Sequence, residues 1–412
     1  MRDSKLFLIL DIDGVLLEAH GYREACVDTI NDFLEQMGMT GLSIDRSIPD
    51  AFEAAGVTAE WDMVPLTLAA AVNWACGNFP DRIFYNNFPP YFSDFSCNDN
   101  ENFQQMLLTK IAAYSSMLDP NLTTINAVWQ FLTEHDGESL DNLWNQPFRD
   151  RFFVDTLNPW RCPFFAQLMT RLLGSKKYSE FYGMNAPVSS ESYLETKDIL
   201  LISEKYQKLL PEIADHSYYP VIMTYRPTLL PSKDGNNDSS YFVNTPEGEC
   251  ALSLLGWTDG RIPMIGAGSL CYIEEKYHLR REYYIKPHPF HALSAVMFAL
   301  CGDEIQALET ARDLCELDPA FAESPAAQWL EKGEKITLVV FEDSTSGIKS
   351  VRNAADNLRK WGYEADERLC GIHTTDAKSQ LLKEEGSLLY PNINYALDDV
   401  LKNDSIERSE NQ

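Results

Sequence analysis

The strongest constraint on the fold is a series of short apolar segments that alternate with helix-like segments from about residue 219 onward. Strand-like segments lie at 219–224, 263–267, 282–285, 336–341 and 369–374. Segments with helical spacing follow them, at 247–255, 270–277, 290–300, 347–360 and 377–385. Strands that alternate with helices predict an α/β fold with a parallel, doubly wound, Rossmann-like sheet.

One more strand-like segment lies about two hundred residues upstream of the others. Residues 6–10 form a continuous apolar run that ends at Asp11 and is followed by Gly14, which is typical of a buried parallel strand. The sequence between this strand and the next is aromatic and helix-like, with little strand alternation. We therefore predict an α/β core from residues 1–20 and 216–412, interrupted by a large, mainly helical domain at 21–215.

Composition limits the class of function. Apolar residues make up 45% and charged residues 23% of the 412, as expected of a globular protein with a sizeable core. The formal net charge of −28 argues against a nonspecific binder of nucleic acid or of anionic membranes, because both need basic surfaces. A site for phosphate would need its own positive potential, from a metal ion and a few cationic side chains.

The cysteines and the apolar runs predict a cytoplasmic protein. The nine cysteines are scattered and include no CxxC pair, which favours reduced thiols over a disulfide framework or a zinc ribbon. The first apolar run is short and ends in acidic residues, unlike a signal peptide, and no run reaches the roughly 18–20 residues of a spanning helix. We expect no membrane segment.

Residues capable of phosphoryl chemistry follow four of the predicted strands. Asp11 and Asp13 come directly after the first strand, and Thr224 closes the second. Lys286 follows the segment 282–285, in the sequence Lys-Pro-His-Pro-Phe, and the pair 342–343 opens the sequence Glu-Asp-Ser-Thr-Ser-Gly. In open α/β sheets ligands bind at the carboxyl ends of the strands. We therefore expect these side chains to share one site.

The four motifs, in this order, resemble the haloacid dehalogenase-like hydrolase superfamily. The match covers the α/β part, about half of the chain, and the segment 371–375 with its following helix is similar to the end of that fold. The resemblance implies that Asp11 attacks phosphorus and forms an aspartyl phosphate, which splits one hard displacement into two easier ones. It implies that Asp13 protonates the leaving oxygen and later deprotonates the attacking water.

The resemblance also implies a Mg²⁺ ion, because carboxylates beside a dianionic phosphate would repel it. Its ligands would be the Asp11 side chain, the main-chain carbonyl of Asp13 and Asp343, with Glu342 as a ligand or as an outer partner. Phosphate oxygens would be held by groups of complementary charge. These are the Lys286 ammonium, the Thr224 hydroxyl and the backbone amides of Ile12 and Tyr225.

The acid at position 13 separates branches of the superfamily. Its dehalogenases lack this acid and work without Mg²⁺, and its transport ATPases carry threonine there. We therefore predict a phosphatase that hydrolyses a small phosphorylated metabolite. A sugar phosphomutase is the alternative, although the cap histidine of such mutases is replaced here by Arg23, with His20 three residues earlier. A catalytically silent binding module on the same fold is a further alternative.

The inserted segment stands where the superfamily places its helical cap. A cap that closes over the site would exclude water and select the substrate, and its length leaves room for homo-oligomerisation. Arg23 is the cap residue that we expect to reach an acidic part of the substrate. Tyr225 and Arg226 replace the small residues often found there, so they would narrow the entrance. His288 and His291 are expected to cap or pack a helix rather than to bind zinc.

Overall fold

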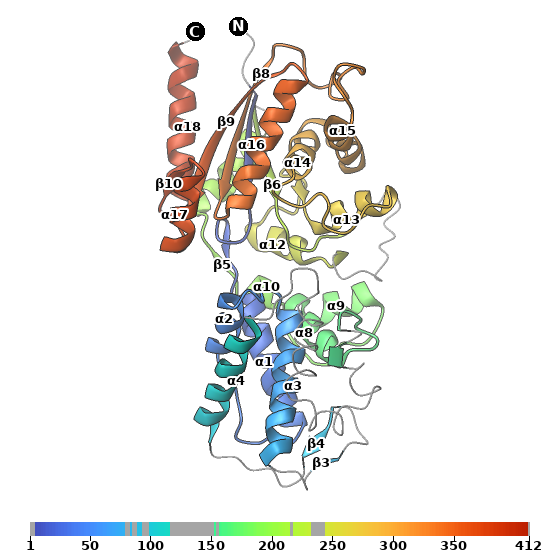
Figure 1. Ribbon diagram of the computed structural model, residues 1–412. Coiled ribbons are helices and arrows are strands. Elements are labelled where there is room, and N and C mark those ends of the chain that lie inside the picture. Colours follow the sequence, from blue (N-terminus) through green and yellow to red (C-terminus); the bar gives the residue numbers. More distant parts are fainter. Residues whose placement is uncertain are drawn as a thin grey trace. The chain divides into compact units, whose positions relative to one another are not determined.

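The computed structural model describes residues 5–78, 83–84, 89–92, 99–115, 152–153, 156–214, 217–231 and 244–410. The chain forms two compact units (Figure 1). The first, called here the sheet unit, contains Met1–Ala19 and Asp198–Gln412. The second, called here the inserted unit, contains His20–Lys197.

The sheet unit is built on six parallel strands, which confirms the predicted α/β class. The strand order is β10-β9-β8-β1-β6-β7. Every neighbouring pair in this order is parallel. The bounds are β1 Lys5–Leu10, β6 Tyr218–Met223, β7 Met264–Ile265, β8 Lys335–Glu342, β9 Glu364–Ile372 and β10 Leu388–Tyr390. The chain therefore builds outward from β1 in both directions, so the order reverses between β1 and β8.

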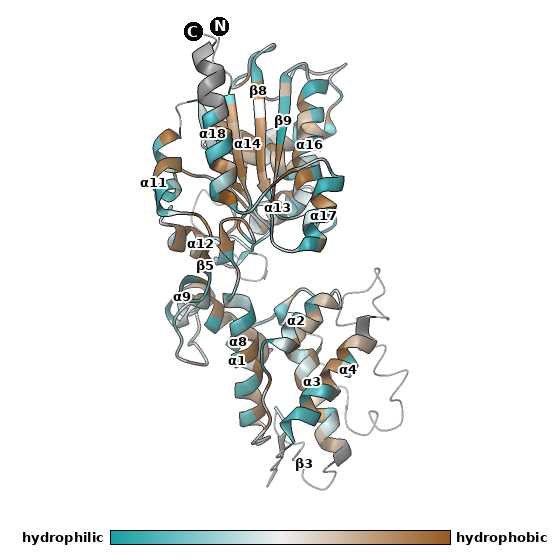
Figure 2. Ribbon diagram, turned by 90° about the vertical axis from the view of Figure 1, so that its left-hand side faces the viewer, coloured by the Kyte–Doolittle hydropathy of each residue, from teal (hydrophilic) through white to brown (hydrophobic). Residues whose placement is uncertain are grey.

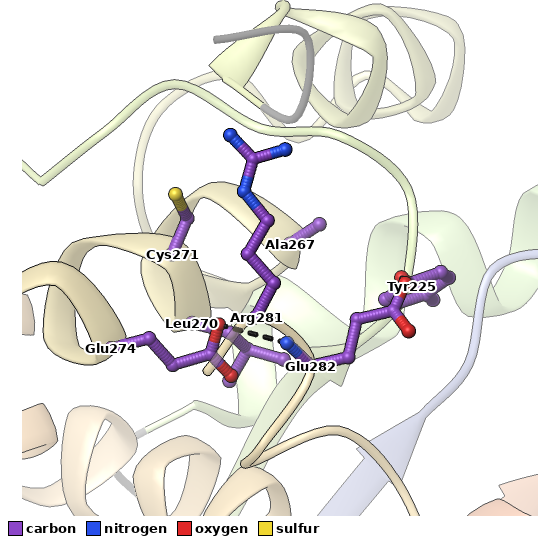
Figure 3. A pocket seen from close by; sticks show the side chains of 7 residues that line it. All are labelled: Tyr225, Ala267, Leu270, Cys271, Glu274, Arg281 and Glu282. Carbon is purple, nitrogen blue, oxygen red and sulfur yellow. Dashed lines mark hydrogen bonds between the residues drawn. The ribbon is translucent and has the colours of Figure 1, made fainter. Parts of the chain in front are cut away.

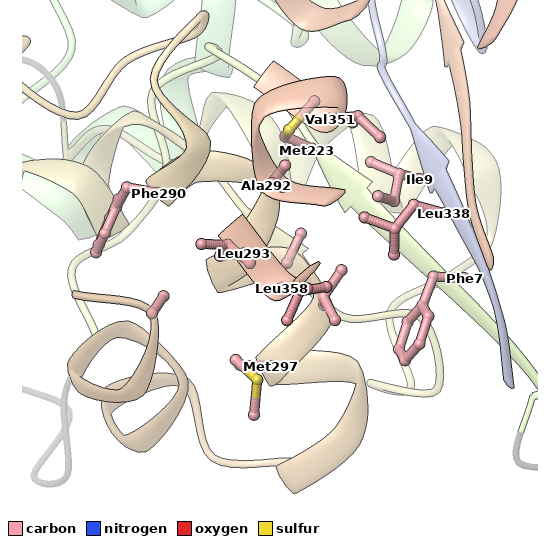
Figure 4. Packing of buried hydrophobic residues seen from close by; sticks show 14 of the residues in the cluster. Phe7, Ile9, Met223, Phe290, Ala292, Leu293, Met297, Leu338, Val351 and Leu358 are labelled. Atoms are coloured by element: carbon pink, nitrogen blue, oxygen red, sulfur yellow. The ribbon is translucent and has the colours of Figure 1, made fainter. Parts of the chain in front are cut away.

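Helices cover both faces of this sheet, and β1 shows why. Its side chains alternate between two apolar clusters, with Phe7 and Ile9 in one and Leu6, Leu8 and Leu10 in the other. Figure 4 shows the first cluster, packed against two helices of that face. These are α14 (Pro289–Cys301) and α16 (Thr345–Lys360). Both faces of β1 are buried, so the strand is a continuous apolar run.

The remaining helices of the sheet unit complete its two outer layers, and Figure 2 shows that hydrophilic and hydrophobic residues both occur along them. Their bounds are α11 Glu204–Ile213, α12 Glu247–Leu255, α13 Ala267–Lys276, α15 Glu304–Glu316, α17 Asp376–Glu384 and α18 Ile393–Glu410. The five helices predicted after residue 219 correspond to α12, α13, α14, α16 and α17, each within a few residues. Apolar spacing locates helices well because each packs one face on the sheet.

The predicted strand at 282–285 is wrong. The segment is a turn, in which the Glu274 carboxylate accepts hydrogen bonds from the backbone N–H groups of Glu282 (3.1 Å) and Tyr284 (3.0 Å). Tyr284 is buried because its ring stacks on Phe290, with ring centroids 3.9 Å apart. The apolar pattern therefore reports burial against α14, and a side chain rather than a strand neighbour satisfies the backbone.

The inserted unit is mainly helical. Its helices are α1 Gly21–Gln36, α2 Ser47–Ala54, α3 Glu60–Asn78, α4 Asn100–Ser115, α8 Pro163–Leu173, α9 Ser175–Tyr182 and α10 Tyr193–Thr196. A small antiparallel pair, β3 (Ile83–Phe84) and β4 (Tyr91–Phe92), adds the only described strands of this unit. Phe33 of α1 meets Phe164 of α8 edge to face at 4.6 Å, and Arg171 pairs with Asp32 beside them.

The sheet unit resumes earlier than residue 216. The segment that returns from the inserted unit forms β5 (Ile199–Leu200), which pairs with β2 (Leu17–Glu18) directly before the chain leaves. The following helix, α11, packs Tyr206 and Leu210 into the core of the sheet unit. A helical pattern alone does not tell which core a helix joins, so the boundary is corrected to Asp198.

Two further sequence expectations concern cysteines and membranes. The eight cysteines among the described residues are free thiols, and most are buried. Within the same residues, none of the helices combines the length and the hydropathy that are needed to cross a bilayer.

Candidate functional site

The candidate site lies at the carboxyl edge of the sheet, where three neighbouring strands end. Asp11 follows β1, Thr224 follows β6, and Glu342 is the last residue of β8. Because β1 lies between β6 and β8 in parallel register, these three ends are adjacent. This edge next to the reversal of strand order is where open α/β sheets bind ligands.

Lys286 reaches the same edge from the turn before α14. Its ammonium lies 3.1 Å from Asp11 Oδ1 and 2.5 Å from Glu342 Oε1, and its side chain is only 7% exposed. Burial by itself lowers the pKa of Lys286, but the charges of Asp11 and Glu342 outweigh it and raise that pKa above its ordinary value. Lys286 therefore stays cationic between two buried carboxylates.

Asp11 is the most perturbed acid of the site. Burial raises its pKa well above the ordinary value, and the nearby charges of Glu342, Asp343 and Asp13 raise it further, against the opposing effect of Lys286. Ionised Asp11 is thus costly unless another cation approaches. Strongly perturbed acids in such a position are typical of functional sites.

Three acids of the site have the spacing of metal ligands. Carboxylate oxygens of Asp11, Glu342 and Asp343 all lie within 4.8 Å of one another. Oxygen ligands of this kind suit a hard divalent cation. Gly14, with φ +75°, leaves room for the group: a Cβ there would lie 2.6 Å from Asp343 Oδ2. The three acids therefore form a donor set that suits a hard divalent cation.

The contacts of Glu342 favour the role of outer partner over that of ligand. Its Oε1 accepts from Lys286, and its Oε2 accepts from the backbone N–H (3.0 Å) and the hydroxyl (2.7 Å) of Ser344. Gly347 is required beside it, because a Cβ at that position would lie 1.7 Å from Oε1. Both oxygens are thus occupied, which leaves Asp11 and Asp343 as the better-placed metal ligands.

Asp343 has a cationic partner that the sequence did not indicate. Lys378, in the first turn of α17, lies 2.6 Å from Asp343 Oδ2. Burial raises the pKa of Asp343, and the Lys378 charge lowers it. The two residues are 35 positions apart, and no local pattern connects them.

Arg226 does not lie at the entrance, where its sequence position suggested it would. It was expected to narrow the entrance, but its side chain is 1% exposed. Its Nε lies 3.1 and 3.0 Å from the two carboxylate oxygens of Asp13, and its Nη2 lies 2.6 Å from Asp13 Oδ1 and 2.8 Å from Asp198 Oδ2. Arg226 therefore clamps Asp13 in one orientation and ties it to the segment that returns from the inserted unit.

The three other groups expected to hold phosphate lie beside Asp11. Thr224 is buried, and its hydroxyl accepts a hydrogen bond from the Arg226 N–H at 3.2 Å. The N–H groups of Ile12 and Tyr225 donate to no other residue in the described part of the chain. Unsatisfied donors at this edge are available to an anionic ligand.

Arg23 lies in the inserted unit, where acids hold its guanidinium. It pairs with Glu60, with Glu53 at 2.6 Å and with Asp50 at 4.0 Å, and its side chain is 12% exposed. These contacts explain its burial within that unit. A role at the substrate stays a prediction.

The two histidines after Lys286 have the structural roles that were expected. His288 Nδ1 accepts from the N–H of Phe290 at 3.1 Å and so caps α14. His291 is fully buried, and burial lowers its pKa to about 3, so it is neutral.

Comparisons with known proteins establish the fold and go no further. No protein-family model matches the chain, and no curated protein matches it. An X-ray structure of a Northeast Structural Genomics Consortium target aligns with a TM-score of 0.58 and 15% identity, over 97% of this chain and 100% of that chain. At this identity the likeness shows a shared fold, so arguments about function depend on the site.

Proposed function

We propose that this chain is a Mg²⁺-dependent phosphatase of the haloacid dehalogenase-like type, which hydrolyses a small phosphate monoester through an aspartyl phosphate on Asp11. The observation that carries the proposal is the imbalance of charge at the site. Five carboxylates, those of Asp11, Asp13, Asp198, Glu342 and Asp343, are held by only three cations, Lys286, Arg226 and Lys378. A divalent cation would offset this excess of negative charge, and a phosphate dianion could then approach the carboxylates.

The proposed first step is an in-line displacement. A carboxylate oxygen of Asp11 forms a bond to phosphorus while the bond from phosphorus to the ester oxygen breaks, and protonated Asp13 gives its proton to that oxygen. Lys286, the Thr224 hydroxyl and the N–H groups of Ile12 and Tyr225 would hold the phosphoryl oxygens. In the second step water attacks the same phosphorus, Asp13 takes its proton, and the Asp11 carboxylate is released.

The metal would be held by Asp11, Asp343 and the main-chain carbonyl of Asp13. When bound, Mg²⁺ would supply the positive charge that lets a phosphate dianion approach an ionised Asp11. Asp11 and Asp343 are buried and have raised pKa values, so a bound cation would stabilise their ionised carboxylates most.

Metal binding is expected to be measurable without any substrate. Mg²⁺ should raise the unfolding free energy by about 2.7 kcal/mol at a concentration of a hundred times its Kd, because it binds only the folded site. Asp343→Asn should largely remove this gain, whereas Asp366→Asn, at an exposed position of β9, should keep it.

Phosphate release from an aryl phosphate should require Mg²⁺ and be inhibited by Ca²⁺, which prefers more ligands at longer distances. Full activity after exhaustive chelation contradicts the metal assignment.

Arg226 is expected to act by positioning Asp13. A lysine cannot reproduce the fork that contacts both Asp13 oxygens and Asp198, so Arg226→Lys should lower kcat about 10- to 100-fold. The Mg²⁺-induced gain in stability should stay, since Arg226 contacts the Asp13 side chain, whereas the proposed metal ligand of Asp13 is its main-chain carbonyl. Arg261→Lys, which alters an exposed pair with Asp259, is the matched control and should change kcat less than twofold. Equal kcat values for the two variants would refute the positioning role.

A further inference from the structure

A pocket of about 110 Å³ opens in the sheet unit beside the candidate site (Figure 3). Three segments form it. Tyr225 comes from the loop after β6, and Arg281 and Glu282 come from the turn that precedes Lys286. The first two turns of α13 supply Ala267, Leu270, Cys271 and Glu274.

The acidic groups of this pocket already have partners. The Glu274 carboxylate accepts from the backbone N–H groups of Glu282 and Tyr284, so its role is to hold the turn. The Tyr225 hydroxyl donates to Glu282 Oε1 at 2.5 Å. Ala267, Leu270 and Cys271 are 6%, 3% and 4% exposed and form an apolar wall on α13. Arg281 adds one cationic side chain to the lining, and most of the remaining surface that a ligand would meet is apolar.

The size of the pocket suits a ring. An apolar cavity of about 150 Å³ binds benzene, so a pocket of about 110 Å³ that is open at one side encloses most of a single ring and leaves the rest at its mouth. Against the apolar wall of α13, hydroxyl groups of a sugar would lose their hydrogen bonds to water, which costs free energy. Polar atoms are offered only from the other side, by Arg281 and by the Tyr225–Glu282 pair. Size and polarity together select an apolar ring over a polyol.

The pocket borders the site through the main chain. Tyr225 directly follows Thr224, and β6 runs beside β1 with Ile222 level with Leu10. Neighbouring strands lie about 4.8 Å apart, so Tyr225 is within reach of a group esterified to a phosphate at Asp11. On the other wall, Glu282 is four positions before Lys286, in the turn that brings Lys286 to Asp11.

We propose that this pocket, defined by Tyr225, Ala267, Leu270, Cys271 and Glu282, binds an apolar, ring-sized part of the leaving alcohol. The substrate class is then a phosphate monoester of a phenol, or of an alcohol with a ring close to the ester oxygen. The assignment of substrate class depends on the proposed phosphatase function, but the binding of the ring does not.

The proposal is tested by filling the pocket. Ala267→Leu places extra carbon atoms in it, and Ala267→Ser keeps the size as the matched control. The leucine variant should raise KM for phenyl phosphate about tenfold or more, and should change kcat/KM for methyl phosphate less than threefold. The serine variant should keep KM for phenyl phosphate and kcat/KM for methyl phosphate within threefold of the parent's values. Cys271→Leu fills the pocket from the next turn of α13 and should repeat the result if Ala267→Leu folds poorly.

Binding of phenol measures the pocket without catalysis. Saturation-transfer NMR should give a signal for bound phenol with the parent protein and with Ala267→Ser. The signal should be absent with Ala267→Leu and with Cys271→Leu. If phenol binds but no phosphate ester is hydrolysed, the proposed phosphatase function is refuted, whereas the proposed ring-binding role of the pocket is supported. If the filled variants lose activity equally toward phenyl and methyl phosphate, and the parent gives no phenol signal, the proposal for the pocket is refuted. The proposed phosphatase function is then unaffected.

Discussion

Replacing Asp11 by Asn abolishes turnover, if Asp11 is the nucleophile. The amide keeps the shape of the side chain but cannot form the aspartyl phosphate, so kcat should fall about a thousandfold or more. The measurement is Mg²⁺-dependent phosphate release from phenyl phosphate. If the Asp11→Asn variant keeps more than a tenth of the parent's activity, another group attacks phosphorus.

The same variant must stay folded for this result to count, and its stability provides the control. Since the pKa of Asp11 is raised, the folded state holds its proton more tightly than the unfolded state. The unfolding free energy of the metal-free parent therefore falls as pH rises from about 4 through the folded pKa of Asp11. Asp11→Asn lacks this contribution, so it should be at least as stable as the parent at pH 8 in the absence of metal.

A mass measurement separates the two proposed steps. Asp13→Asn, which should slow the hydrolysis of the aspartyl phosphate more than its formation from a good leaving group, should accumulate protein heavier by one phosphoryl group. Asp11→Asn should never acquire that mass. Appearance of the phosphorylated mass in Asp11→Asn would place the nucleophile elsewhere.

Lys286→Met should cause the largest loss of stability. It removes the common partner of Asp11 and Glu342, whose side chains are 12% and 0% exposed. Leaving buried carboxylates without their cation costs about 3–5 kcal/mol, and kcat should also fall at least about a hundredfold because the phosphate loses its ammonium. Chemical denaturation without metal at pH 8 measures the first effect.

The pH dependence distinguishes lost charge pairing from lost packing. Without Lys286 the pKa of Asp11 rises further, because the one cation that lowers it is gone. The folded variant then binds protons more strongly than the parent, so its stability should fall more steeply with rising pH, and the deficit should shrink toward pH 5. Lys276→Met, which removes an exposed partner of Glu309, should cost less than about 1 kcal/mol at any pH. A deficit that is the same at pH 5 and pH 8 would contradict the charge argument.

The tertiary structure corrected the sequence-based prediction where contacts are long-range. Lys286 was expected after a strand because the residues before it form a short apolar segment, yet Tyr284 is buried by Phe290 and the backbone is held by Glu274. Residues 204–213 lie inside the predicted insertion, 21–215, because helix-like spacing carries no information about which core a helix packs on. Both corrections concern the surroundings of a segment, and those surroundings come from residues far away in the sequence.

The elements of the sheet unit and the residue types of the site were predictable from local sequence. Residues 6–10 form a continuous apolar run because both faces of β1 are covered, and the carboxylates and Thr224 were recognisable because they stand directly after apolar segments. The pairing of the charged groups emerged only from the folded chain. Arg226 meets Asp13 across 213 positions, and Lys286 meets Asp11 across 275. Periodicity records how far each side chain is buried, but a charged pair depends on two distant segments arriving at the same edge of the sheet.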